Sequence, residues 1–231
     1  MIKILVTGGH GRFASELKKI KTNIKFVYLT KKELNILNPS SILRAIKKFK
    51  PKKILHLAGL SRPMSDHEKD ITKSINLNIV GTANLVNACS KFKIKIIYFS
   101  TSYVYPGNKG DYKETDALLP WNNYAWSKLG GEAAVQMYKN SLILRVCMTE
   151  KPFVHNKAYA NVKSNFVYQD DLAKIFLKVI NKKGVYNIGG KSQTIFNFVS
   201  KYKKNIKKLF SKGEFPLKQN MNLKKLYKIV K

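Results

Sequence analysis

The sequence of 231 residues contains few acidic residues, few cysteines and no long apolar run. Asp and Glu number 13 against 44 Lys and Arg, which gives a formal net charge of +31. No apolar run reaches the roughly 18 residues that a membrane-spanning helix requires, so we expect no such helix and no membrane partner. The first residues read directly as a strand, without the layout of a signal peptide. The two cysteines, Cys89 and Cys147, lie in apolar stretches and predict buried free thiols in a reducing compartment, so we expect a cytoplasmic protein.

Arginine is also scarce, although the chain is strongly basic. Only four of the 44 basic residues are arginine, the side chain that best reads bases and binds phosphate in two contacts. The lysines are spread along the chain instead of forming one block. Charge alone supports only nonspecific binding, so we expect no specific nucleic-acid partner. The positive field favours the recruitment of an anionic substrate.

A turn that contains glycines follows the first expected strand. Residues 2–7 form an apolar run typical of a buried parallel strand, and residues 8–11 read Gly-Gly-His-Gly before a helix-like stretch. Gly8 permits the tight turn, Gly11 lets the backbone approach a pyrophosphate, and Ala14 stands where a third glycine often lies. Strand, glycine turn and helix together predict a dinucleotide site, with an ordinary βα turn as the alternative.

The second expected strand, residues 25–29, ends without an acid. A site that selects NAD usually places an acid here to hold the ribose hydroxyls. This chain has Thr30-Lys31-Lys32 instead, and two ammonium groups suit the 2′-phosphate of NADP better. We therefore predict NADP as the cofactor, with NAD as the alternative. The opposing interpretation is that both lysines simply face solvent.

Hydroxyl groups follow the central expected strand, residues 94–99, in the run Ser100-Thr101-Ser102. Ligands bind at this edge of open α/β sheets. Tyr124 and Lys128 are four residues apart and therefore share one face of a helix, where the ammonium favours the phenolate form of the tyrosine. With Thr101 holding a carbonyl oxygen, the set suits proton transfer to oxygen while a hydride moves at carbon. In a lysine-rich chain, the alternative is a solvated helix surface.

The order of these elements predicts the fold class. Strands expected at 53–57 and 141–146 alternate with helices expected at 39–49, 70–92 and 124–138. Such alternation predicts an α/β protein with a parallel sheet covered on both faces. Beyond residues 147–152 the pattern loosens, with a polar loop expected over 150–165. His56, in an apolar run, is expected to be a packed strand residue.

Five motifs in order carry a resemblance to a known family. They are Thr7–Ala14, His56–Gly59, Asn78–Thr82, Ser100–Tyr105, and Tyr124 with Lys128. The chain resembles the extended short-chain dehydrogenase/reductase (NAD-dependent epimerase/dehydratase) family, well over about residues 1–146 and more weakly around 166–190. Within that family it is most similar to the dTDP-4-dehydrorhamnose reductase branch, because Leu34-Asn35-Ile36 stands where the branch often has Leu-Asp-Ile.

The resemblance implies a Rossmann-type doubly wound parallel sheet with a small C-terminal substrate lobe. The implied domains are a dinucleotide-binding domain, residues 1–146, and a reduced substrate-binding lobe, residues 147–231, partly interleaved with the sheet. Tyr124 would protonate the carbonyl oxygen, Lys128 would bind the nicotinamide ribose, and Thr101 would orient the substrate. No metal is implied. The implied cofactor-binding residues are Thr7, Gly8, Gly11, Arg12, Phe13, Lys31, Asn35, Ile36, Ala58, Gly59, Tyr124 and Lys128.

The residues after Thr101 bear on the reaction. Relatives that dehydrate a nucleotide-sugar carry Asp-Glu there, and relatives that epimerise and reduce GDP-sugars carry a cysteine at the second position, whereas this chain has Ser102 and Tyr103. We therefore predict an NAD(P)H-dependent reductase of a 4-keto-6-deoxy nucleotide-sugar. The alternatives are a C4 epimerase with retained NAD and a non-catalytic dinucleotide-binding module.

The resemblance also implies a homodimer formed through the helices of residues 70–92 and 123–139. Three residues of the substrate lobe are candidates to face a nucleotide diphosphate, with plain loop positions as the alternative. They are His155, Lys157 and Lys163.

Overall fold

The computed structural model describes residues 3–230, which divide into two compact units. Unit 1 comprises residues 3–100, 122–144 and 180–185, and unit 2 comprises residues 101–121, 145–179 and 186–230. The chain thus passes between the units several times. The predicted dinucleotide-binding domain (residues 1–146) and substrate-binding lobe (residues 147–231) are defined by what they bind, so this division stays a prediction.

A six-stranded sheet has the order β10-β5-β4-β3-β1-β2, and most of its residues belong to unit 1. Strand β1 pairs in parallel with β2 and β3, and β3 pairs in parallel with β4. The strands are β1 (Lys3–Thr7), β2 (Lys25–Tyr28), β3 (Lys53–His56), β4 (Lys95–Thr101), β5 (Ser141–Val146) and β10 (Gly184–Ile188). This sheet, with helices between its strands, confirms the predicted α/β class of Rossmann type.

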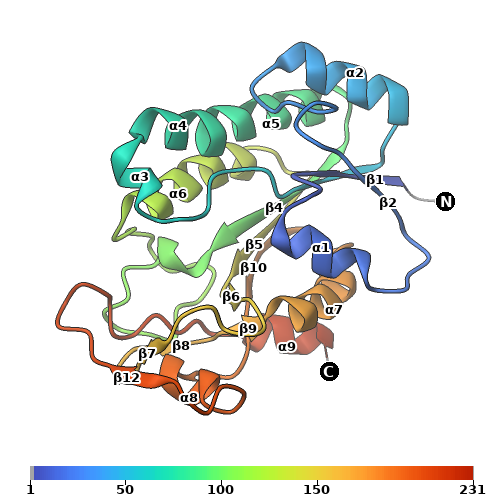
Figure 1. Cartoon of the computed structure of the whole chain (residues 1–231). Helices are drawn as coiled ribbons and strands as arrows, with labels where there is room; N and C mark the ends of the chain where they lie inside the picture. Colours follow the sequence, from blue (N-terminus) through green and yellow to red (C-terminus); the bar gives the residue numbers. More distant parts are fainter. Residues whose placement is uncertain (1–2, 231) are drawn as a thin grey trace. The chain divides into compact units, whose positions relative to one another are not determined.

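Helices of unit 1 cover both faces of the sheet. In Figure 1, α1 lies on one face, while α2, α5 and α6 lie on the other. From β1 to β2 the chain moves across the sheet in one direction, and from β2 onward it moves in the opposite direction. Because crossovers between parallel strands are right-handed, a change of direction places the connecting helices on the other face. The helical segments are α1 (Arg12–Lys18), α2 (Pro39–Phe49), α3 (Asp66–Lys69), α4 (Ile71–Ile75), the π-helical turn η1 (Asn76–Val80), α5 (Gly81–Lys91) and α6 (Asn123–Gln136).

Local sequence explains where these helices begin and which face they bury. Asn38 caps α2 by accepting a hydrogen bond from the backbone N–H of Ser41, and Pro39 occupies the first turn, where its missing N–H costs nothing. The apolar face of α2, with Ile42 and Ile46, is buried in the same core as α5 and the sheet. The segmentation of residues 70–92 differs from the single helix predicted there, because a π-helical turn interrupts it.

Unit 2 consists mainly of short strands. Three two-stranded sheets pair β11 with β8, β12 with β7, and β6 with β9. The polar loop predicted over 150–165 is therefore partly wrong, since it contains two short strands. The elements are the 3₁₀ turn η2 (Ser102–Val104), β6 (Met148–Thr149), β7 (Lys157–Tyr159), β8 (Lys163–Ser164), β9 (Val167–Tyr168), α7 (Gln169–Val179), β11 (Gln193–Thr194), α8 (Ile195–Val199), β12 (Lys207–Leu209) and α9 (Lys224–Val230).

The described part of the chain contains no helix that combines the length and the apolar character needed to cross a membrane.

Candidate active site

The glycine turn after β1 is folded tightly against the end of β3. Gly8 has φ +65, and a Cβ built on it would lie 2.8 Å from the backbone nitrogen of Ala58. The N–H of Gly11 donates to the carbonyl of Gly8 at 2.8 Å, and Gly11 is the N-cap of α1. The turn therefore presents backbone at the start of a helix, which is the chemistry that a pyrophosphate requires.

The hydroxyl of Thr7 makes hydrogen bonds within the protein. Its Oγ1 accepts hydrogen bonds from the backbone N–H groups of Leu57 and Ala58, at 3.2 and 3.1 Å, and lies 2.8 Å from Nδ1 of His56. These bonds join the ends of β1 and β3. Of the predicted cofactor-binding residues, Thr7 and Ala58 are thus brought together with the glycine turn.

His56 is buried, as predicted, and belongs to a hydrogen-bonded chain. Its Nε2 lies 3.0 Å from Oγ1 of Thr82, whose hydroxyl donates to the carbonyl of Asn78. Burial, followed by the positive charge of Lys128, lowers the pKa of His56 to about 3. The imidazole is therefore neutral at physiological pH, which excludes it as a charged cofactor ligand.

An acid follows β2 a few residues beyond the position where the sequence lacks one. The carboxylate of Glu33 accepts from the backbone N–H and the hydroxyl of Thr30, at 2.8 and 2.9 Å. These bonds hold the pKa of Glu33 below its usual range. The loop after β2 therefore does contain an acid, although this carboxylate is engaged by its own loop. Lys31 and Lys32 are both exposed.

Two other predicted cofactor ligands, Phe13 and Ile36, are buried. Phe13 is buried with its ring 4.7 Å from that of Phe99, and the buried side chain of Ile36 contacts Gly81 closely. Asn35 accepts from the backbone N–H of Leu37 at 3.0 Å.

Of the two remaining candidates, one follows β3 in a loop and the other is the first residue of α1. Gly59 has φ +158, and a Cβ there would lie 2.6 Å from the side-chain oxygen of Asn78. One guanidinium nitrogen of Arg12 lies 3.4 Å from the hydroxyl of Ser61.

The predicted proton donor occupies the first turn of α6. Asn122 caps this helix by accepting from the N–H of Ala125 at 2.8 Å. The hydroxyl of Ser127 donates to the carbonyl of Tyr124 at 2.8 Å and accepts from the amide of Asn78 at 2.8 Å. Tyr124 itself is half-buried. The backbone of the first turn is therefore tied to η1.

Lys128 is half-buried one turn further along α6, beside two buried groups. Its Nζ lies 4.1 Å from the ring centroid of Tyr98, whose hydroxyl donates to the Lys128 carbonyl at 2.9 Å. Burial lowers the pKa of Lys128 to about 7, and the carboxylate of Glu132 opposes this shift. Glu132 is fully buried, and one of its oxygens accepts from the amide of Gln136 at 3.0 Å.

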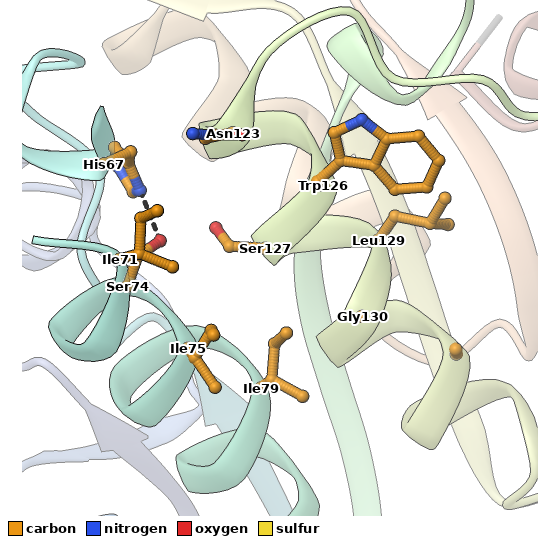
Figure 2. A pocket seen from close by; sticks show the side chains of 11 residues that line it. His67, Ile71, Ser74, Ile75, Ile79, Asn123, Trp126, Ser127, Leu129 and Gly130 are labelled. Carbon is orange, nitrogen blue, oxygen red and sulfur yellow. Dashed lines mark hydrogen bonds between the residues drawn. The ribbon is translucent and has the colours of Figure 1, made fainter.

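A groove of about 420 Å³ lies between α4 and α6 in unit 1 (Figure 2). Its walls come from α4, η1 and α6, and its lining is mainly apolar. His67 lines it as well, with Nδ1 at 2.7 Å from Oγ of Ser74 and its ring 5.1 Å from the ring of Tyr124. The lining residues are His67, Ile71, Ser74, Ile75, Ile79, Asn123, Trp126, Ser127, Leu129, Gly130 and Ala133.

The third predicted catalytic residue, Thr101, is the last residue of β4 and the first of unit 2. It is buried, and its hydroxyl oxygen accepts from the backbone N–H of Tyr103 at 3.3 Å, which caps η2. The ring of Tyr103 packs against those of Trp121 and Phe215, at 5.1 and 5.6 Å. The candidates of the predicted substrate lobe, His155, Lys157 and Lys163, are all exposed.

Comparison with known proteins decides the family. Residues 2–188 match the family model described as the RmlD substrate binding domain. The chain belongs to this family. A curated relative, dTDP-4-dehydrorhamnose reductase of Aggregatibacter actinomycetemcomitans, is 30% identical over 68% of this chain and 54% of its own length. Methionine adenosyltransferase 2 subunit beta of Xenopus laevis is 34% identical over 49% of this chain and 34% of its own length. The chain thus spans about half or less of these curated relatives.

Solved structures of proteins named dTDP-4-dehydrorhamnose reductase show the same fold. The dTDP-4-dehydrorhamnose reductase (rfbD) of Bacillus anthracis str. Ames in complex with NADP has a TM-score of 0.83, with 22% identity over 96% of this chain and 90% of that chain. The rfbD ortholog of Clostridium acetobutylicum has a TM-score of 0.84, with 20% identity over 99% of this chain and 92% of that chain. The predicted resemblance is therefore confirmed at the level of family and fold.

Sequence reasoning missed several residues that hold the candidate site in place. Asn78, Tyr98 and Glu132 are buried polar or ionisable residues that contact the helix of Tyr124 and Lys128 or belong to it. Asn78 belongs to one of the five motifs, and Glu132 follows Lys128 by one helical turn. Their positions in the sequence could therefore have marked them as neighbours of the candidate site. His67 had no such signal.

Proposed function

We propose that the protein is an NAD(P)H-dependent reductase of a 4-keto-6-deoxy nucleotide-sugar. The observation that carries the proposal is the placement of Lys128 one turn after Tyr124 on α6, with its Nζ 4.1 Å from the ring centroid of the buried Tyr98. Burying a lysine costs free energy. Ionisable side chains in such costly environments are found most often at functional sites. Membership of the RmlD family and the relatives named dTDP-4-dehydrorhamnose reductase support the same substrate class.

In this reaction each of three residues has one task. Tyr124, in the first turn of α6, donates a proton to the carbonyl oxygen. Lys128 binds the nicotinamide ribose and stabilises negative charge on the Tyr124 oxygen as the proton leaves. Thr101 holds the carbonyl oxygen by a hydrogen bond. The reduced nicotinamide, when bound, supplies the hydride. Net reduction needs no further acid or base, which fits Ser102 and Tyr103 after Thr101.

The glycine turn fits the dinucleotide. The close approach of Gly8 to Ala58 leaves no room for a side chain, and the N-terminal turn of α1 offers backbone N–H groups to phosphate. For the 2′-phosphate we propose Lys31 and Lys32, since both are exposed while Glu33 is held by Thr30. NADP is therefore the proposed cofactor, and the Bacillus anthracis reductase of the same fold is a complex with NADP.

The decisive experiment supplies a 4-keto-6-deoxy nucleotide-sugar with NADPH and follows the absorbance of the reduced nicotinamide. We expect stoichiometric oxidation by the wild type and, by Tyr124→Phe, only a trace that long incubations are needed to detect, with cofactor affinity nearly unchanged. Ser65→Ala is a control, because Ser65 is exposed and its hydroxyl makes no capping bond. Sugar interconversion without net cofactor consumption would favour the C4 epimerase with retained NAD.

A second candidate function is a non-catalytic dinucleotide-binding subunit. The observation that favours it is the similarity to proteins named methionine adenosyltransferase 2 subunit beta, at 34% identity over 114 residues. This candidate predicts tight cofactor binding with no reduction of any nucleotide-sugar tested, and equal behaviour of wild type and Tyr124→Phe. A thermal-shift screen against nucleotide-sugars distinguishes the two, because only the reductase is expected to be stabilised by them.

We also propose that the protein forms a homodimer through the helices of residues 70–92 and 123–139. Apolar side chains on these helices are exposed in one chain: Ile71 by 55%, Ile75 by 44% and Trp126 by 49%. All three line the groove in Figure 2. Contiguous exposed apolar side chains typically mark an interaction surface.

A cytoplasmic location remains part of the proposal. Cys89 and Cys147 are both free and buried. Burial raises the pKa of the Cys89 thiol to about 12, and it also raises the pKa of Cys147. Such thiols are unreactive and fit a compartment in which cysteines stay reduced.

A further inference from the structure

His67 is a fully buried histidine that the proposed mechanism does not use. It lies on α3, a helix of one turn, and lines the groove beside α6 (Figure 2). A polar ring buried at this depth requires a reason, because burial costs free energy unless the ring contributes a contact or a hydrogen bond.

The position of the imidazole is set by one hydrogen bond and one ring contact. Its Nδ1 lies 2.7 Å from Oγ of Ser74, whereas its Nε2 has no hydrogen-bond partner among residues 3–230. Ser74 is itself buried. The hydrogen bond to Ser74, a residue of α4, therefore fixes the angle of the imidazole ring.

The ring contact is made with Tyr124. The centroids of the two rings are 5.1 Å apart and their planes meet at 63°, an edge-to-face arrangement. This is a favourable geometry for aromatic pairs, and it opposes rotation of the phenol ring. The same turn of α3 also reaches the start of α6, where the amide of Asn123 donates to the carboxylate of Glu68.

Electrostatics favour a neutral His67. Burial is the main cause that lowers its pKa below the ordinary value, and the charge of Lys128 lowers it further. The carboxylates of Asp66 and Glu68 act in the opposite direction without reversing the shift. His67 therefore acts near neutral pH as an uncharged aromatic ring, so its effect on Tyr124 is one of packing and orientation.

We propose that His67 is a positioning residue for Tyr124, an inference that rests on the proposed function. The imidazole, oriented by Ser74, holds the phenol ring so that its hydroxyl stays aligned with the carbonyl oxygen that it protonates. Displacement of a reacting group by about 1 Å can cost on the order of a hundredfold in rate. His67 touches neither substrate nor cofactor in this proposal.

The test is a double-mutant cycle on turnover, with His67→Ala measured in the wild-type and Tyr124→Phe backgrounds. We expect His67→Ala to lower kcat by about tenfold to a hundredfold with little change in KM for the sugar. In the Tyr124→Phe background, measured over long incubations, it should have no further effect. His67→Phe keeps the ring edge but loses the hydrogen bond to Ser74, so its kcat should lie between those of His67→Ala and the wild type.

Two further variants separate orientation from general stability. Ser74→Ala removes the hydrogen bond that orients the imidazole and should lower kcat, whereas Ser65→Ala on the same segment should not. If His67→Ala does not fold, His67→Phe and Ser74→Ala carry the test. An inactive His67→Phe, or a Ser74→Ala variant with wild-type kcat, overturns the inference.

The outcomes also distinguish this inference from the proposed function. Full activity of Tyr124→Phe refutes the catalytic assignment itself. An inactive Tyr124→Phe together with a fully active His67→Ala refutes only the positioning role. Equal fractional losses from His67→Ala in both backgrounds also refute it, because the effect then does not pass through the Tyr124 hydroxyl.

Discussion

Replacing Gly8 with alanine should destabilise the protein more than any conformational preference alone explains. Gly8 has φ +65, a conformation that residues with a Cβ rarely adopt. A Cβ at this position would lie 2.8 Å from the backbone nitrogen of Ala58, 2.9 Å from its Cα and 3.0 Å from the carbonyl carbon of Leu57. All three atoms belong to backbone at the end of β3, so no side-chain rotation relieves the contact.

The magnitude follows from two separable costs. A positive φ costs a non-glycine residue about 1–2 kcal/mol. Forcing backbone apart in a packed region adds about 1–3 kcal/mol. Gly8→Ala should therefore lose about 2–5 kcal/mol of unfolding free energy. Gly184→Ala is the matched control, because Gly184 has φ +83 and a Cβ there meets nothing within 4 Å, so it carries the conformational cost alone.

Urea denaturation of both variants, followed by circular dichroism, measures the difference. We expect Gly8→Ala to be less stable than Gly184→Ala by about 1–3 kcal/mol, and to bind NADPH more weakly because the turn is displaced. Equal losses in the two variants would refute the reasoning, since the close approach of the turn to β3 would then carry no cost. Unchanged NADPH affinity in a folded Gly8→Ala would separate this turn from the cofactor site.

The remaining predictions concern charge and association. Because the pKa of Lys128 is lowered to about 7, its ammonium is lost as pH rises through that value, so kcat/KM should decline above it; a flat profile to pH ~9 would contradict the role of the ammonium. The pKa of Lys128 is 10.5 in the unfolded chain and about 7 in the folded protein, so the unfolded chain binds more protons between these pH values. The free energy of unfolding should therefore increase with pH from about 7 to 10.5, and denaturation at several pH values measures this increase. Lys31→Ala should weaken NADPH binding but not NADH binding in fluorescence titrations, and tighter NADH binding by the wild type would refute the NADP assignment. Trp126→Asp should abolish self-association in sedimentation velocity, and a wild-type monomer at micromolar concentration would remove the homodimer.

The fold was predictable because its signals are local. The apolar run of β1, the glycines after it and the apolar face of α2 each lie within a dozen residues of sequence. Short strands such as β8, with two residues, have no periodicity to detect, so they were missed. The π-helical turn η1 was also missed, because its sequence reads like the helices on either side.

The candidate site was predictable only in part. The spacing of Tyr124 and Lys128 is visible in sequence, but the contacts that give them their chemistry join distant segments. The amide of Asn78 meets Ser127 across 49 residues, and the hydroxyl of Tyr98 meets the Lys128 carbonyl across 30. The lowered pKa of Lys128 results from burial created by this packing, which no local pattern encodes.

The predicted site residues are divided between the two units, and this division helps to distinguish the two candidate functions. Every predicted cofactor-binding residue, together with Tyr124 and Lys128, belongs to unit 1, whereas Thr101 belongs to unit 2. Unit 1 alone therefore contains the groups proposed to bind the dinucleotide and to transfer the proton. The proposed reductase additionally uses the hydroxyl of Thr101, which belongs to unit 2. Cofactor binding is thus expected of both candidate functions and distinguishes neither. The rate of sugar reduction, compared between the wild type and Thr101→Val, is the measurement on which they differ.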